Sequence, residues 1–426
     1  MTSFQMVQYP TRILRCGRSF AGAEAVVGRA GRCDDAAMIA PLSPLVRATG
    51  TPPIPAARAW AARYRGQAGP AIDLTQAVPG YPPHPELLAR LAEAAGTRAG
   101  ASYGDIFGDE VLRAALAADL ARRYGVAIAP DDVAITAGCN LAFAMAMTTI
   151  AEPGSAVMLP APWYFNHQMA LQMQGVGVVP LPCAAAAGFV PDPEEAARLL
   201  TPATRAIVLV TPNNPTGAIY PPAVIARFAS LCRERGLWLV LDETYRDFLP
   251  GEAAPHGLFG DPGWGEHLIH LYSFSKAYCV PGHRVGAIAA GPVLREQLAK
   301  VLDTMQICPP RAAQTALSWA VEGLRSWRDG NRGIMSGRAR AFAAAMAGVN
   351  SWRVDALGGY FAYLRLPDAA PEAMVAAEYL AAERGLMGLP GPFFGPGQGR
   401  HIRLAFANAE ADAIAGVPGR LAGLWT

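Results

Sequence analysis

A lysine flanked by hydroxyl groups and followed by an arginine is the feature of this sequence with the clearest chemical potential. The chain holds only two lysines, Lys276 and Lys300. Lys276 follows an apolar run of strand length, with Ser273 and Ser275 just before it and Arg284 eight residues after it. Partial burial at a strand end lowers the pKa of an amine and makes it nucleophilic, and two hydroxyls with a guanidinium can bind a phosphate. The pattern favours a Schiff-base lysine over a surface lysine beside a structural ion pair.

A carboxylate at the end of another apolar run is the second candidate. Segment 237–245, LWLVLDETY, places Asp242 there and Tyr245 three residues later. A buried carboxylate needs a partner, and a protonated pyridine nitrogen is a suitable one, because the carboxylate keeps such a ring able to accept electrons. Tyr245 can donate to a ring hydroxyl. The alternative interpretation of Asp242 is an acidic helix cap.

Two glycine-containing turns follow further strands. Segment 211–217, TPNNPTG, predicts a tight turn that points Asn214 into a crevice, unless it is a plain Asn-Pro turn. Segment 135–142, ITAGCNLA, is typical of a strand, a turn at Gly138 and a helix start. The free N–H groups of Cys139 and Asn140, with the helix dipole, would form an anion site. Cys139 is interpreted as a small residue and not as a nucleophile.

An aromatic residue and an arginine complete the set of candidates. In segment 162–165, PWYF, Tyr164 can stack on a flat ring, although a packed aromatic fits as well. Arg403 lies in the apolar strand that follows His401. A buried arginine needs an anion, and a bidentate carboxylate is its best match. An internal salt bridge is the alternative.

Short apolar runs alternate with amphipathic helical stretches from residue 71 onward. Leu112, Leu116 and Leu120 recur every four residues and mark one buried helix face. Alternating strands and helices favour an α/β fold with a mostly parallel sheet, in which ligands bind beyond the strand ends. The predicted strands are Val133–Thr136, Ala156–Leu159, Val176–Leu181, Ala206–Val210, Leu237–Leu241, Leu268–Tyr272 and Val285–Ala289. The predicted helices include Ala56–Tyr64, Asp109–Tyr124, Leu141–Ile150 and Ala223–Arg235.

The pattern of predicted helices and strands changes after Pro309 and Pro310. Residues 311–349 are expected to be a long helical stretch, followed by a strand (Gly358–Leu366), a helix near Glu372–Arg384, a Gly/Pro loop (Gly388–Gly399) and a strand at Ile402–Phe406. We expect residues 71–310 to form a large domain and residues 311–426 a smaller α+β domain. Residues 41–70 would be an N-terminal arm or part of the small domain.

Bulk composition narrows the class of protein. The 426 residues, 52% hydrophobic and 16% charged, suit a large folded core. The net charge of +2 and the absence of a long basic run argue against nucleic-acid or anionic-membrane partners. No apolar run reaches the length of a membrane span. The seven scattered cysteines predict neither disulfides nor a metal site and fit a reducing cytoplasm.

We expect residues 1–40 to form an irregular N-terminal extension. Residues 1–37 contain several arginines and no helical or strand period. A disordered leader, or a misplaced start codon with Met38 as the true start, is favoured over a transit peptide.

Taken together, the motifs resemble the aspartate aminotransferase superfamily, class I and II, of fold type I, over about residues 41–426. The resemblance implies a three-layer α/β/α large domain with a mostly parallel seven-stranded sheet, and pyridoxal 5′-phosphate (PLP) as cofactor. It also implies an amino acid and a 2-oxo acid as substrates, and a homodimer with shared active sites. The resemblance implies that Lys276 binds the cofactor covalently and shuttles the proton, that Asp242 pairs with the pyridinium, and that Tyr164 stacks on the ring. It implies that Asn214 and Tyr245 bond the ring hydroxyl, and that the phosphate is held by Ser273, Ser275, Arg284 and Gly138–Asn140. It further implies that Arg403 binds the substrate α-carboxylate and that Tyr103 reaches the phosphate of the partner subunit.

One position departs from the family pattern. The family often has a glycine where this chain has Ala77, in the segment Leu74–Pro79 close to the substrate. The extra methyl bears on substrate range, with Ala77 still expected to line the substrate site.

The function that follows is ping-pong transamination of an L-α-amino acid, with 2-oxoglutarate as the expected second substrate. Leu141–Ile150 lacks the basic residue that some aspartate-specific relatives carry, so neutral or aromatic amino acids are favoured, while aspartate stays open. The nearest alternative is a Cβ–S lyase of the same fold. A PLP-binding regulator would need a DNA-binding domain that residues 1–40 do not suit, and a purely structural protein would not explain the filled cofactor positions.

Overall fold

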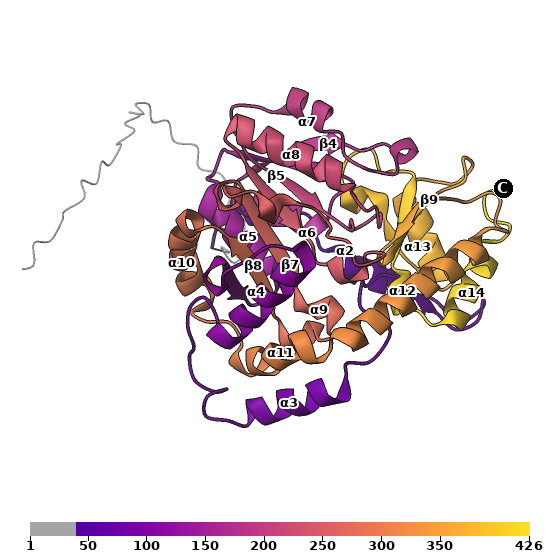
Figure 1. Cartoon of the computed structure of the whole chain (residues 1–426). Coiled ribbons are helices and arrows are strands. Elements are labelled where there is room, and N and C mark those ends of the chain that lie inside the picture. The colour runs from indigo at the N-terminus through magenta and orange to yellow at the C-terminus, as the bar shows by residue number, and fades with distance from the viewer. Residues whose placement is uncertain (1–39) are drawn as a thin grey trace, which may run out of the picture. The chain divides into compact units, whose positions relative to one another are not determined.

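The computed structural model of the chain describes residues 40–426. The predicted leader of residues 1–37, and all but the last residue of the predicted extension 1–40, lie outside the described residues. The part from Ser43 onward forms one compact unit, shown in Figure 1 from indigo to yellow.

A seven-stranded sheet is the largest sheet of the described part, in the order β2-β8-β7-β6-β5-β3-β4. Its strands pair in parallel except for β8, which is antiparallel to both neighbours. The strands are β2 (Val133–Thr136), β3 (Ala156–Ala161), β4 (Gly177–Pro182), β5 (Thr204–Val210), β6 (Trp238–Asp242), β7 (Leu268–Ser273) and β8 (Gly286–Ala290). All seven predicted strands are present, and the expected mostly parallel sheet is confirmed.

The central strands are apolar throughout because both faces of this sheet are covered by helices. Successive residues of a strand point to opposite faces, so Leu239 and Leu241 of β6 pack into one core cluster while Val240 packs into another. The first cluster includes residues of α3 (Pro85–Ala95), α4 (Glu110–Tyr124), α8 (Pro222–Arg235) and α11 (Arg311–Gly323). The second includes residues of α5 (Cys139–Ile150), α6 (Phe165–Met173) and α10 (Pro292–Gln306). The result is the expected three-layer α/β/α arrangement (Figure 1).

A second, antiparallel sheet lies in the C-terminal part, in the order β12-β13-β10-β9. Its strands are β9 (Arg353–Gly358), β10 (Phe361–Arg365), β12 (Leu389–Pro390) and β13 (His401–Leu404), and the segments α13 (Ala373–Glu383) and α14 (Ala411–Leu421) share its core. A short parallel pair, β1 (Ile72–Asp73) and β11 (Leu386–Met387), lies beside them. The predicted strand Gly358–Leu366 spans the end of β9, a turn and β10.

The expected helical stretch 311–349 is two helices. It breaks at Leu324, between α11 and α12 (Arg325–Met346). The Trp319 ring lies 2.7 Å from where a Cβ would stand at Gly323, so only glycine fits where α11 ends. Two short helices, α1 (Pro44–Ala48) and α2 (Pro53–Ala61), precede β1, and α7 (Pro193–Leu199) precedes β5. No helix within residues 40–426 has both the length and the apolarity needed to cross a bilayer.

The predicted domain boundaries stay a prediction. The C-terminal core includes Ile72 and Leu74 from the start of the predicted large domain. The long helix α12 contacts β9 and α14 as well as the segment that follows β6. Both observations show how closely the segments on either side of those boundaries are packed together.

Adjacent leucines of α3 provide a matched test of the core. Leu87 is fully buried, whereas Leu88 is 45% exposed. We expect Leu87→Ala to lower the free energy of unfolding by about 2–5 kcal/mol because it leaves a cavity. Leu88→Ala should change it by about 0.5 kcal/mol or less. Urea denaturation followed by circular dichroism measures both; equal losses in the two variants would contradict this packing.

Candidate active site

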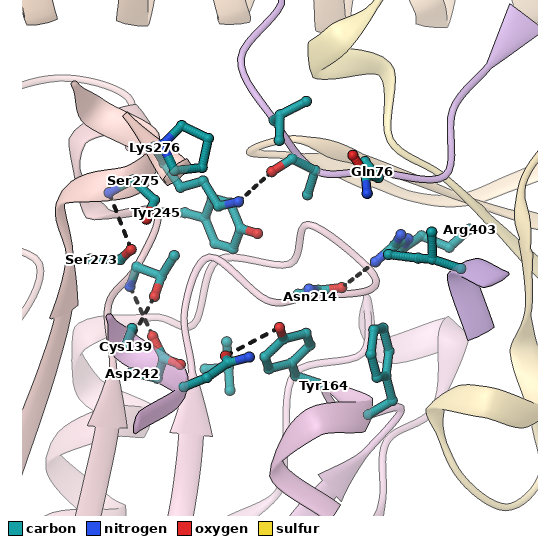
Figure 2. Close-up of a pocket in the computed structure, with 18 of the residues that line it drawn as sticks. Gln76, Cys139, Tyr164, Asn214, Asp242, Tyr245, Ser273, Ser275, Lys276 and Arg403 are labelled. Carbon is teal, nitrogen blue, oxygen red and sulfur yellow. Dashed lines mark hydrogen bonds between the residues drawn. The ribbon is translucent and has the colours of Figure 1, made fainter. Parts of the chain in front are cut away.

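A cavity of about 360 Å³ lies beyond the carboxyl ends of the parallel strands. Strands β3, β5, β6 and β7 run in the same direction, so the residues that follow them meet at one edge of the sheet. Arg403 of the C-terminal part lies across the cavity from Asp242 (Figure 2), and Ile54 of α2 also lines the cavity. The cavity is lined by Ile54, Thr75, Gln76, Ala77, Val78, Cys139, Asn140, Tyr164, Phe165, Val210, Asn214, Asp242, Thr244, Tyr245, Ser273, Ser275, Lys276, Pro281, Arg284 and Arg403.

The Lys276 side chain projects into this cavity from α9 (Phe274–Ala277), the short helix that follows β7. Its Nζ donates a hydrogen bond to the carbonyl oxygen of Ala77. Burial first, and then the positive charges of Arg403 and Arg284, lower the pKa of Lys276 to about 8. A substantial fraction of this amine is therefore unprotonated, and nucleophilic, near neutral pH.

Hydroxyl groups, an arginine and a helix N-terminus form a set of anion-binding groups at one end of the cavity. Ser273 caps α9, and its hydroxyl accepts a hydrogen bond from the backbone N–H of Ser275 at 3.3 Å. Gly138 caps α5 with φ 96°, and the space of its missing Cβ lies 2.2 Å from Nη2 of Arg284. A side chain at position 138 would displace the guanidinium. The first N–H groups of a helix have no partners within the helix, so α5 offers Cys139 and Asn140 to an anion.

Asp242 is held ionised at the end of β6. It is buried, and its Oδ2 lies 3.3 Å from Nε2 of His167, while its Oδ1 accepts a hydrogen bond from the backbone N–H of Thr244 at 2.9 Å. Burial alone would raise the pKa of Asp242, but the contacts with His167 and Thr244 bring it below its usual value. The carboxylate can therefore accept a charged hydrogen-bond donor.

Tyr164 and Tyr245 present their rings to the cavity. The Tyr164 hydroxyl donates to Oδ1 of Asn140 at 3.3 Å, and Tyr164 precedes α6 directly. Figure 2 shows the Tyr245 ring beside Lys276. Burial is the largest cause that raises the pKa of both phenols, so each keeps its proton as a hydrogen-bond donor.

Arg403 is the buried cation of the cavity. Only 2% of the residue is exposed. Its Nη1 donates to Oδ1 of Asn214 at 2.9 Å, and its Nη2 donates to the carbonyl oxygen of Thr75. Within residues 40–426 no carboxylate lies within 4 Å of it, and its Nε has no hydrogen-bond partner there. Burial lowers the pKa of Arg403 to about 10. A guanidinium in this state is set up to bind an external carboxylate.

Gly138 and Tyr103 are the two predicted site residues that do not line the cavity. Tyr103 is 77% exposed and does not line the cavity of its own chain. Ala77 does line the cavity, and it also packs against the cluster that contains Tyr245. Its carbonyl oxygen contacts Lys276, so the backbone at this position faces the amine.

The sequence did not predict three residues of the site: His167, which contacts Asp242 but does not line the cavity, and the lining residues Thr244 and Ile54. His167 follows Tyr164 by three residues, and the two rings meet edge-on at 5.2 Å. The three-residue spacing between Tyr164 and His167 could have predicted that both side chains point the same way, because residues three apart share a helix face. Thr244 and Ile54 carried no comparable signal.

The donor set of the cavity fits PLP. Lys276 supplies an amine, Asp242 an ionised acceptor and Tyr164 a flat ring. The phosphate would meet the hydroxyls of Ser273 and Ser275, together with Arg284 and the start of α5. Arg403 retains an unpartnered Nε for a second ligand with a carboxylate.

Comparisons with known proteins agree with this chemistry. The family model "Aminotransferase class I and II" matches residues 70–417. An aspartate/prephenate aminotransferase of Thermus thermophilus is 29% identical over 84% of this chain and 92% of its own. An arginine–pyruvate transaminase of Pseudomonas aeruginosa is 31% identical over 71% of this chain and 77% of its own.

The fold has solved counterparts. The structure of the Thermus thermophilus aspartate aminotransferase with maleate has a TM-score of 0.82 and 27% identity, covering 90% of this chain and 99% of that one. The fold, the cavity and the family match agree. The chain belongs to the aminotransferase class I and II family and is a PLP-dependent amino-acid aminotransferase.

Proposed function

We propose that Lys276, Asp242 and Arg403 carry out the transfer of an amino group from an L-α-amino acid to a 2-oxo acid in this cavity. The observation that carries the proposal is the buried guanidinium of Arg403, which has no carboxylate partner among the described residues and shares one cavity with an amine of lowered pKa. The two substrates of such a reaction have in common a carboxylate next to the reacting carbon. One arginine therefore serves both in turn, as ping-pong kinetics require.

The cofactor would be held at both of its ends. The Lys276 amine would bind its aldehyde carbon, and Asp242 would accept a hydrogen bond from its ring nitrogen. Ser273, Ser275 and Arg284 would bind the phosphate together with the Gly138–Asn140 turn, while Tyr164 would stack on the ring. When bound, PLP supplies an electron sink for the charge that develops at the substrate α-carbon.

Lys276 would also move the proton. Its amine would lie next to the bound substrate and would take the proton from the α-carbon. Asn214 and Tyr245 would donate hydrogen bonds to the ring oxygen of the cofactor. Asn214 already contacts Arg403 through its Oδ1, so its amide group is oriented with its Nδ2 free to donate elsewhere.

The substrate side chain would be neutral or aromatic. Within the described residues, the only cations lining the cavity are Lys276, Arg284 and Arg403, each with a role above. Ile54 and Phe165 add apolar surface. Aspartate would need a cation from elsewhere, such as a partner subunit. The related sequences act on varied substrates by name, including an aromatic aminotransferase of Arabidopsis thaliana at 27% identity. We propose 2-oxoglutarate as the acceptor.

A homodimer fits the placement of Tyr103. Its ring is largely exposed, and in the proposed dimer its hydroxyl would reach the phosphate site of the partner subunit. Five cysteines of residues 40–426 are free thiols, which supports a reducing cytoplasm as the location.

The lysines provide the direct test of the proposed roles. With PLP, one amino acid and 2-oxoglutarate, the wild type should form the new oxo acid and glutamate in equal amounts. Lys276→Ala should lower the rate by at least about 10⁴-fold, the upper range for a lost proton-transfer group. The matched variant Lys300→Ala, at an exposed position on α10, should keep the wild-type rate. Release of ammonia without an acceptor would favour a lyase instead.

The acidity of Lys276 predicts a pH profile. Only the neutral amine reacts with an acylating reagent, so in the cofactor-free protein labelling of Lys276 should rise with pH to half its maximum near pH 8. Mass spectrometry of the labelled peptides measures it, with Lys300 as the internal reference for reagent reactivity. A midpoint of 10 or above, near the ordinary value of about 10.4 for lysine, would refute the lowered pKa.

Arg403 should matter equally for every substrate. Arg403→Ala is expected to reduce kcat/KM by roughly 30-fold to 5,000-fold, the range for a buried charge pair worth about 2–5 kcal/mol. The loss should be the same for phenylalanine and aspartate. Arg365→Ala, on the neighbouring strand β10, is the control and should have no effect. A loss confined to aspartate would contradict the α-carboxylate role.

A further inference from the structure

A second cavity, of about 350 Å³, lies between α4, α12 and η3 (Arg246–Phe248), the short turn that follows Tyr245. It shares no lining residue with the active-site cavity. Its walls are almost entirely charged, with more arginines than carboxylates. The active-site chemistry uses none of these residues.

Two buried carboxylates and two buried arginines form the floor of this second cavity. Arg246 lies 2.6 Å from Asp119, and Arg328 lies 3.0 Å from Asp119 and 2.7 Å from Asp247. All four side chains are at most 12% exposed. Arg246 also stacks on the Tyr272 ring at 4.2 Å. The arrangement fixes both guanidiniums rigidly, and the two carboxylates neutralise them.

Arg123 adds a third guanidinium that has no direct ion-pair partner among the described residues. Within residues 40–426 it has no carboxylate within 4 Å, and its Nη2 is buried without a hydrogen-bond partner. Nη1 of Arg246 and Nε of Arg328 also lack partners there. Burial first, and then the charge of Arg246, lower the pKa of Arg123. Three guanidiniums therefore line one cavity, while only two carboxylates, Asp119 and Asp247, are paired with them.

The outer arginines of the cavity already form ion pairs. Arg122 pairs with Asp119 and shares Glu322 with Arg325, and Arg332 pairs with Asp329. Glu252 is exposed at the rim and has no arginine partner among the described residues. Arg123 is therefore the one lining arginine without an ion-pair partner among the described residues, and its charge would attract an anion into the cavity.

We propose that this second cavity is a binding site for a phosphate group. Guanidiniums match phosphate oxygens in geometry and charge, and a phosphate offers enough oxygens to reach three separate guanidiniums, which a carboxylate does not. The volume falls in the range of about 300–1,000 Å³ for small-molecule sites, so it also admits the organic part of a phosphate ester. A bound phosphate would join α4 and η3 to α12.

The test uses the PLP-loaded protein in phosphate-free buffer and isothermal titration calorimetry. Inorganic phosphate and glycerol phosphate are the two probes, and we expect one site per chain with a Kd of about 1 mM or below. Arg123→Gln should weaken binding about tenfold, since it removes a charged hydrogen-bond donor. Glu252→Gln, at the exposed rim, should tighten it about threefold by removing a repulsive charge. Arg227→Gln, an exposed arginine on α8, should bind as the wild type does.

The two probes distinguish the source of the phosphate, because tighter binding of the ester indicates an organic phosphate and equal binding indicates free phosphate. Either result supports the site. No binding of either probe up to about 10 mM, or unchanged binding in both Arg123→Gln and Glu252→Gln, would overturn it. Binding lost in Arg403→Gln but kept in Arg123→Gln would place the phosphate in the active site and also overturn it.

Discussion

The repulsion between two cations in one cavity links substrate binding to the reactive amine. Arg403 is buried without a carboxylate among the described residues, and after burial its charge is the largest cause of the lowered pKa of Lys276. A buried charge without an opposite charge is costly, so a ligand carboxylate would stabilise it. By Coulomb's law, a carboxylate on Arg403 offsets this effect on the amine. Arg403, the proposed substrate-binding group, and Lys276, the proposed proton-transfer group, are thus electrostatically coupled.

The fold brings these two cations together from segments far apart in the chain. Lys276 and Asp242 follow neighbouring strands of the seven-stranded sheet, whose carboxyl ends meet at one edge. Arg403 comes from β13 of the antiparallel sheet, and its contacts with Asn214 and Thr75 tie that sheet to the cavity. The apolar strands of the large sheet, covered on both faces, hold this edge rigid.

Much of this arrangement follows from local sequence, and the exceptions have physical reasons. The central strands were predictable because a parallel sheet buried on both faces makes its strands continuous apolar runs. β9 was not, because its residues are only partly buried or exposed and carry no apolar run. The break at Leu324 was not predicted either, because the residues on both sides of it are helical and no change of periodicity marks it. The second charged cavity joins Arg123, Arg246 and Arg328 from three separate elements, and each looks like a surface arginine in isolation.

The central claim is that Lys276, one of only two lysines, holds the cofactor covalently. Sodium borohydride reduction of the PLP-loaded protein makes that bond permanent, and peptide mass spectrometry then locates the pyridoxyl group. The account predicts the label on the peptide that contains Lys276 and none on the peptide that contains Lys300. A label on Lys300, or a protein that binds PLP without any reducible bond, would contradict it.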